Sequence, residues 1–172
     1  PKAEDSFLAQ AKTLLAENKI NEAHSAIEQA YTLNNDRADI KLVLCDVNIQ
    51  MGKLEQAQAL VDTILMADQN ADYHAVLAKL ELAGQAANSP EIQALEAKLN
   101  ETPDAIDIKH QLAAQYNQVN RNEEALLLLF RLMQSDSSDD KSKTLFLDIL
   151  KALPDGDPLA NKYRRKLYTL MY

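Results

Sequence analysis

The chain has 172 residues, of which 47% are hydrophobic and 26% charged, and its formal net charge at neutral pH is −8. This composition, with only three glycines and five prolines, is that of a folded, helix-rich chain. No apolar run approaches the roughly 20 residues that span a bilayer. No basic segment followed by an apolar one opens the chain, so a secretory signal is not indicated.

The charge is unevenly distributed along the chain. Residues 162–172 contain four basic and no acidic side chains, so residues 1–161 carry −12. An acidic body repels nucleic acid and anionic membrane surfaces, and we expect neither as a partner. Cys45 is the single cysteine, which excludes an internal disulfide and fits a reducing compartment.

Three similar hexapeptides, each a turn followed by a helix start, recur at a fixed spacing. They are Asn18–Ala23, Gly52–Ala57 and Asn120–Ala125, separated by 34 and 68 residues. A period of 34 residues is that of tetratricopeptide helix pairs. The sequence therefore predicts an all-α, tetratricopeptide-like right-handed superhelix of about ten helices in five antiparallel pairs. The predicted units are 4–37, 38–71, 72–105, 106–139 and 140–172, which together form a single repeat domain.

Two positions of each unit require a small side chain, because neighbouring helix backbones approach closely there. A larger side chain would overpack such a position at a cost of about 1–3 kcal/mol. Units one, two and four meet the requirement at both positions, with Ala11, Cys45 and Ala113 at the first and Ala23, Ala57 and Ala125 at the second. We expect all six side chains to be buried.

The third unit departs from this pattern. Lys79 occupies a position that requires a small side chain, and Ala86–Pro90 interrupts the helix predicted from Tyr73 to about Gln85. Ser89 and Pro90 are typical of a helix N-cap and a first helical residue. We interpret unit three as an imperfect joint between two better-packed halves.

The fourth and fifth units are expected to cover one another. Leu126–Met133 is apolar nearly all the way round, so its helix requires burial on several sides. Residues 154–156 predict a turn, after which Asp157 and Pro158 begin a last helix that ends near Tyr172. One face of this helix is apolar and should dock on unit four. The opposite face carries basic and aromatic side chains.

Sites for chemistry are not predicted. Cys45 is explained by packing, and the three histidines share no metal-ligand spacing. The acidic segment Asp136–Asp140 lacks the glycine and glutamate of a calcium loop and predicts a helix cap. No glycine-rich phosphate loop is present. We therefore expect no catalytic residues, cofactor or metal.

Peptide recognition is the functional class that the repeat favours, because first helices of such repeats line an inner groove. The groove candidates are Leu8, Lys12, Leu15, Leu42, Asp46, Ile49, His110 and Asn117. With a single lysine among acids and aliphatics, this groove is not expected to grip a terminal carboxylate. Its leucines and isoleucine, taken as exposed, suit either an apolar segment of a partner or another helix of the same chain.

The chain also resembles one family, the bacterial chaperedoxins, from about Asp5 to Tyr172. The resemblance rests on Ser89–Leu95, on Asn122–Ala125, and above all on the ending Asn161–Tyr168. Chaperedoxins are thioredoxin-like co-chaperones with a tetratricopeptide-like C-terminal domain. The resemblance implies a thioredoxin-like domain upstream of Pro1, and the absence of an initial Met also suggests a fragment of a longer chain.

The resemblance implies a function and a set of partners. Members of the family act in the cytoplasm as holdases, keep unfolding clients soluble, and hand them to the chaperonin and to the Hsp70 system. The family contacts the chaperonin through the C-terminal helix, here residues 158–172. This implies a docking surface formed by Arg164, Arg165, Tyr168, Met171 and Tyr172. The alternative is a passive scaffold in a cytoplasmic assembly, without holdase activity.

Overall fold

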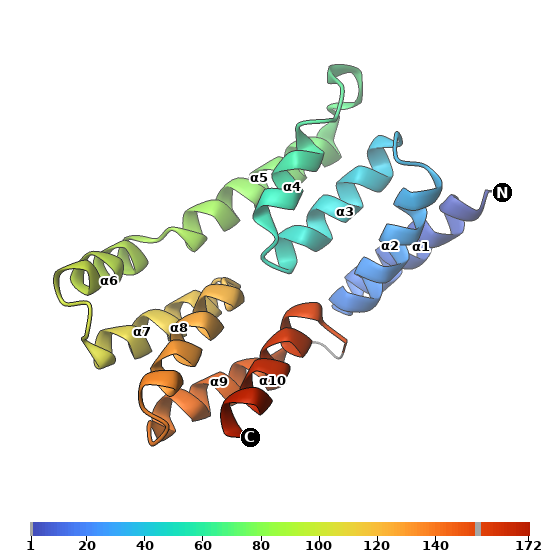
Figure 1. Cartoon of the computed structure of the whole chain (residues 1–172). Helices are drawn as coiled ribbons and strands as arrows, with labels where there is room; N and C mark the ends of the chain where they lie inside the picture. Colours follow the sequence, from blue (N-terminus) through green and yellow to red (C-terminus); the bar gives the residue numbers. More distant parts are fainter. Residues whose placement is uncertain (1, 154–155) are drawn as a thin grey trace. The chain divides into compact units, whose positions relative to one another are not determined.

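The structure, a computed structural model, describes residues 2–153 and 156–172, and every regular element in this part of the chain is helical (Figure 1). The elements are α1 (Ala3–Ala16), α2 (Ile20–Leu33), α3 (Ala38–Gln50), α4 (Leu54–Val61), a short 3-10 helix η1 (Met66–Asp68), α5 (Ala71–Ala87), α6 (Pro90–Glu101), α7 (Ile106–Gln118), α8 (Asn122–Ser135), α9 (Asp140–Ala152) and α10 (Pro158–Met171). The predicted all-α fold is confirmed. Two residues of the predicted turn at 154–156, Pro154 and Asp155, lie outside the described residues.

The helices group into two compact units, which we describe separately. Unit 1 is Pro1–Ala86 and unit 2 is Ala87–Tyr172. The division lies in the last turn of α5, next to the segment Ala86–Pro90 that interrupts the repeat pattern.

Unit 1 is built from two helical hairpins and the helix that follows them. α1 packs against α2, and α3 packs against α2, α1 and α4. One apolar cluster, which includes Ile27 and Ile40, joins α1, α2 and α3. A second cluster joins α3 and α4 to Val76 and Leu80 of α5. Each hairpin thus buries the apolar face of its neighbour, as expected of a helical repeat.

Unit 2 has one large core centred on α8. This helix packs against α7, α9 and α10, and α7 also packs against α6. Leu126, Leu129 and Phe130 of α8 are buried together with Phe146 of α9 and Tyr163 of α10. The prediction that the fifth pair of helices covers the apolar helix Leu126–Met133 is therefore confirmed.

The six small residues of the repeat are all completely buried. Ala11, Cys45, Ala113, Ala23, Ala57 and Ala125 have exposed fractions of 0%. An alanine-sized side chain lets two helix backbones approach closely, because nothing longer separates them. This confirms the packing role predicted from their spacing.

The turns inside three hairpins share one backbone geometry. Asn18, Gly52 and Asn120 each have positive φ, between 61° and 75°. The N–H of the residue after each of them donates to a carbonyl five residues earlier, with N···O distances of 2.8 Å at Lys19, Lys53 and Arg121. This is the Schellman arrangement, in which glycine or asparagine adopts the left-handed conformation and ends a helix. The 34-residue spacing of the hexapeptides is thus the spacing of one repeated helix stop.

Replacing Gly52 with alanine is expected to destabilise unit 1 by about 1 kcal/mol, because a Cβ disfavours left-handed backbone. The matched variant Gly84→Ala should act in the opposite direction. Gly84 lies inside α5, and a Cβ added there would meet nothing within 4 Å. Alanine there should therefore stabilise the helix by about 0.5–1 kcal/mol. Urea unfolding followed by circular dichroism measures the change in the free energy of unfolding for each variant. If both variants stabilise or both destabilise the chain, the assignment of the turn is contradicted.

Two helix starts have the side-chain caps that the sequence predicts. Ser89 Oγ accepts a hydrogen bond from the backbone N–H of Ile92 at 3.3 Å, and Asp157 accepts one from that of Leu159 at 2.8 Å. Both helices continue with proline, whose fixed φ suits the first helical position.

The structure differs from the sequence prediction at two places in unit 1. The helix predicted from Tyr73 to about Gln85 extends from Ala71 to Ala87, so Gly84 lies in its last turn. The fourth helix has only eight residues, and the chain continues through η1, where Leu65 and Met66 are 72% and 86% exposed. The hydroxyl of Thr63 donates to the carbonyl of Leu60 at 2.7 Å, a local bond that competes with continuing the helix.

Candidate interaction surfaces

The C-terminal helix α10 is anchored to unit 2 by aromatic packing. Tyr163 is buried, and its ring lies 6.4 Å from that of Phe130 and 6.1 Å from that of Phe146, both edge-on. Burial raises the pKa of the Tyr163 hydroxyl. Lys162 also forms an ion pair with Glu123 of α8 at 3.1 Å. These contacts hold the helix in one rotation about its axis.

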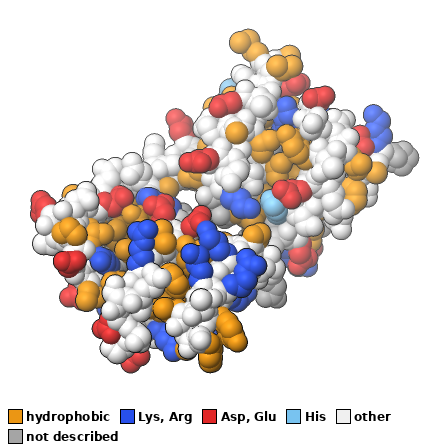
Figure 2. Space-filling view, viewed as in Figure 1, with side chains coloured by type: hydrophobic (Ala, Val, Ile, Leu, Met, Phe, Trp, Pro, Cys, Tyr) orange, Lys and Arg blue, Asp and Glu red, His pale blue; other side chains and the backbone are white. Residues whose placement is uncertain are grey.

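That rotation leaves the predicted docking residues on the solvent side. Arg164, Arg165, Tyr168, Met171 and Tyr172 are all exposed, and we call them the C-terminal stripe. Tyr168 and Tyr172 are 67% and 88% exposed, and their ring centroids lie 4.9 Å apart. Figure 2 shows Lys and Arg side chains gathered over α10. Exposed tyrosine and arginine on a rigid helix are typical of binding hot spots.

A shallow groove beside the C-terminal stripe was not predicted from the sequence. It has a volume of about 580 Å³ and lies between α8 and α10, lined by Phe130, Leu170 and three basic side chains. One of these, Lys166, places its Nζ 5.5 Å from the centre of the Phe130 ring. The sequence feature that could have indicated this groove is the spacing of Lys162 and Lys166, which places both lysines on one face of the helix.

The predicted groove on the first helices is largely filled by the chain itself. Leu8, Leu42, Ile49 and His110 are buried, which corrects the expectation that these leucines and isoleucine are exposed. Leu42 and Ile49 belong to the same cluster as Val76 and Leu80 of α5, so another helix of the chain covers them. Leu8 is packed among residues of α2 and α3 in the other cluster. Leu15 of unit 1 and Asn117 of unit 2 are half-buried.

The remaining candidates, Lys12 and Asp46, line an open cleft of about 760 Å³ in unit 1, together with the buried Leu42. The cleft is bordered by α1, α3, η1 and α5. Five aspartates and three basic residues lie around it, above a floor of small apolar residues. The net charge of this lining is negative, whereas a site that holds a terminal carboxylate requires a positive one.

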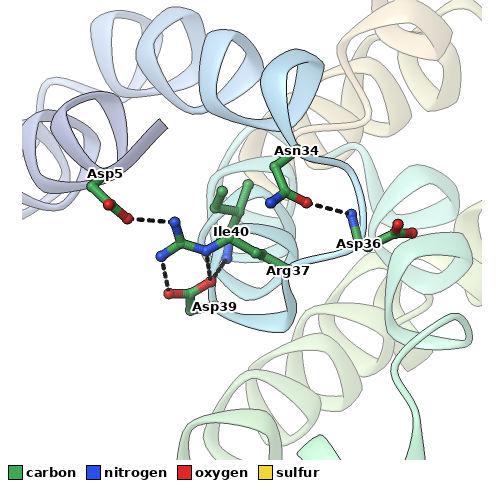
Figure 3. A network of polar contacts seen from close by, with 6 residues as sticks. All are labelled: Asp5, Asn34, Asp36, Arg37, Asp39 and Ile40. Carbon is green, nitrogen blue, oxygen red and sulfur yellow. Dashed lines mark hydrogen bonds and ion pairs between the residues drawn. The ribbon is translucent and has the colours of Figure 1, made fainter. Parts of the chain in front are cut away.

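Arg37 organises one edge of this cleft (Figure 3). Its guanidinium forms ion pairs with Asp39, at 2.8 Å, and with Asp5 of α1. Hydrogen bonds from Arg37 hold the pKa of both carboxyl groups below the usual range. Two carboxylates therefore share one guanidinium, and both remain ionised at neutral pH.

His110, Ser142 and Asp139 form a buried polar cluster in unit 2 that superficially resembles a catalytic triad. The Ser142 hydroxyl donates to Asp139 Oδ2 at 2.6 Å, and its oxygen lies 2.7 Å from His110 Nε2. Ser142 is completely buried, so a substrate does not reach its hydroxyl. Asp139 also accepts from the backbone N–H of Ser142 at 2.9 Å. The cluster therefore caps α9 and ties it to α7; it does not generate a nucleophile.

Cys45 has the surroundings of an unreactive thiol. Its side chain is completely buried and its Sγ lies 3.4 Å from the carbonyl oxygen of Ala57. Burial, together with the nearby charge of Asp46, raises the thiol pKa to about 12, so almost no thiolate exists at neutral pH. Within residues 2–153 and 156–172, no three His, Cys, Asp or Glu side chains are grouped as a metal site would require. In the same residues, none of the helices combines the length and the apolar character needed to span a bilayer.

Comparison with known proteins agrees with this architecture. Tetratricopeptide repeat models match residues 14–80 and 85–172. An uncharacterised protein from Haemophilus influenzae is 38% identical over 175 residues, which cover 100% of this chain and 80% of the relative. A solved domain of a protein of unknown function from Vibrio parahaemolyticus is 39% identical. The superposition of the two structures has a TM-score of 0.85 and covers 98% of this chain and 99% of the Vibrio domain.

These matches cover both units, and the second repeat model extends over half of the chain. The repeated helix stops and the buried alanines are the physical basis of the match. Tetratricopeptide repeats generally mediate contacts between proteins, and no enzyme family is indicated. The chain belongs to the tetratricopeptide repeat family.

Proposed function

We propose that this chain is the protein-interaction domain of a thioredoxin-like co-chaperone of the chaperedoxin type. In this proposal residues 1–172 act as one repeat domain beside a thioredoxin-like domain. The domain binds unfolding clients in the cytoplasm and passes them to the chaperonin and to Hsp70-type chaperones. It docks on the chaperonin through the C-terminal stripe of α10, and unit 1 contacts the client.

The observation that supports docking is the exposure of two neighbouring tyrosines on a helix that is anchored to unit 2. Tyr168 and Tyr172 expose most of their surface, whereas Tyr163 of the same helix is buried. Because α10 is held by Tyr163 and by the Lys162–Glu123 ion pair, the stripe is ordered before binding. A partner therefore loses little free energy to ordering of this surface.

The double variant Tyr168→Ala, Tyr172→Ala is expected to weaken binding to purified chaperonin at least about tenfold, as expected for loss of hot-spot aromatic residues. Biolayer interferometry with the immobilised chain measures the dissociation constant. Deleting all of α10 is a poorer test, because it uncovers the apolar residues of α8.

A matched control removes exposed apolar surface elsewhere. Leu65 and Met66 of unit 1 are as exposed as the two tyrosines, so Leu65→Ala, Met66→Ala makes a comparable loss of surface. This control should leave the chaperonin affinity unchanged. Unaltered affinity in the tyrosine variant, or equal losses in both, would rule out docking through the stripe.

Holdase activity distinguishes the proposal from a passive scaffold. The chain, mixed with a model protein that unfolds on heating, should slow the rise in light scattering in proportion to its concentration. A chain that leaves the scattering unchanged would favour the passive scaffold, with α10 as an assembly contact only.

A further inference from the structure

We infer that the cleft of unit 1 binds an extended, basic peptide segment of another protein, whose lysine or arginine stems lie on the apolar floor and whose charges meet the aspartates. This deepens the proposed function, since it rests on unit 1 contacting the client and names the kind of segment contacted. Four observations about the cleft support it.

The first is the balance of charge. Among the side chains around the cleft, Lys79 pairs with Asp46 at 3.1 Å, and Arg37 is shared by Asp39 and Asp5. Lys12 is then the remaining cation of the lining.

The second is the set of aspartates that remain. Asp36, Asp68 and Asp72 are exposed on three different segments of the rim, and the ion pairs found in the described residues do not include them. Among residues 2–153 and 156–172 these carboxylates have no ion-pair partner, so this part of the rim presents uncompensated negative charge.

The third observation is the floor between these aspartates. It contains Ala38, Val43 and Ala75, which are partly or fully exposed, beside the buried Leu42 and Val76. Such a floor suits the methylene groups of lysine and arginine. These side chains place their stems on apolar surface while their charged ends remain in water.

The fourth is the position of one of these unpaired carboxylates. Asp72 lies in the first turn of α5, where the helix dipole favours a negative side chain. An acidic peptide, a nucleic acid or a terminal carboxylate would be repelled from this surface.

The experiment uses the full chain and three fluorescein-labelled heptapeptides with alternating residues, Gly-X-Ala-X-Ala-X-Gly. X is lysine, acetyl-lysine or glutamate: acetylation keeps the four-methylene stem of lysine and removes its charge, and glutamate places a negative charge on a shorter stem. Fluorescence anisotropy should show binding of the lysine peptide, weaker binding of the acetyl-lysine peptide and none of the glutamate peptide. Equal binding of all three peptides, or no binding of the lysine peptide, would overturn the inference.

Two double variants with the same change in net charge locate the site. The double variant Asp36→Asn, Asp68→Asn removes two rim charges, neither of them in an α-helix. It should weaken binding of the lysine peptide about fivefold, because exposed ion pairs contribute only a modest free energy. Glu101→Gln, Asp104→Asn removes two exposed charges of unit 2 and should have no effect. Equal losses would reveal a general charge effect and refute a site in the cleft. Neither chaperonin nor client is present, so the docking proposal can fail without affecting this result.

Discussion

Replacing Phe146 with alanine is expected to reduce the free energy of unfolding of unit 2 by about 3–5 kcal/mol. Phe146 is completely buried at the centre of the unit, between the rings of Phe130 and Tyr163, whose centroids lie 6.3 and 6.1 Å away. The substitution removes the transfer free energy of the ring and leaves a cavity that a rigid three-helix contact fills poorly. Urea unfolding followed by circular dichroism measures the change.

The conservative variant Phe146→Leu separates volume from aromatic contact. Leucine keeps most of the apolar volume but loses the two ring pairs, so a cost of about 1–2 kcal/mol is expected. A loss below about 1 kcal/mol for Phe146→Ala would mean that α8, α9 and α10 do not share the core described.

The second large effect is expected at Asp139, where alanine should destabilise unit 2 by about 2–3 kcal/mol. The change removes the N-cap of α9 and leaves the buried hydroxyl of Ser142 without its acceptor. Asp140 provides the control, since it is exposed in the first turn of the same helix. Asp140→Ala should change the stability much less, and equal effects of the two variants would contradict a specific cap.

The contribution of Asp139 should also depend on pH in a defined direction. Burial acts to raise the pKa of this carboxyl, but hydrogen bonds from Ser142 and the neighbouring His110 outweigh it, and the pKa is lowered. A lowered pKa in the folded state means stability that is present above the ordinary value and is lost as the pH falls below it. The difference in the free energy of unfolding between wild type and Asp139→Ala should therefore be largest at pH 7 and decrease below about pH 4.

The helical hairpins could be predicted from the sequence because their determinants are local. An asparagine or glycine that ends one helix and an alanine five residues further along are visible in any window of the chain, and both recur at Asn18 and Ala23, Gly52 and Ala57. The early end of α4 was less visible, since it depends on the side-chain bond of Thr63. The exposed tip at Leu65 and Met66 follows from that stop.

The interaction surfaces were predictable only where one helix carries them. The C-terminal stripe occupies successive turns of α10, so its spacing alone places it on one face. Leu42 and Ile49 have the same kind of spacing, yet α5 buries them, because periodicity identifies an apolar face without identifying what covers it. The acidic cleft draws Asp36, Asp68 and Asp72 from three separate segments, and no sequence period connects them.

The burial of Cys45 gives the chain a built-in reporter. It is the one thiol among 172 residues, and it is completely enclosed between α3 and α4 with its pKa raised to about 12. A maleimide or disulfide reagent therefore reacts with it when these two helices separate. The labelling rate under native conditions counts those separations, so spontaneous opening of this hairpin can be timed without any engineered probe.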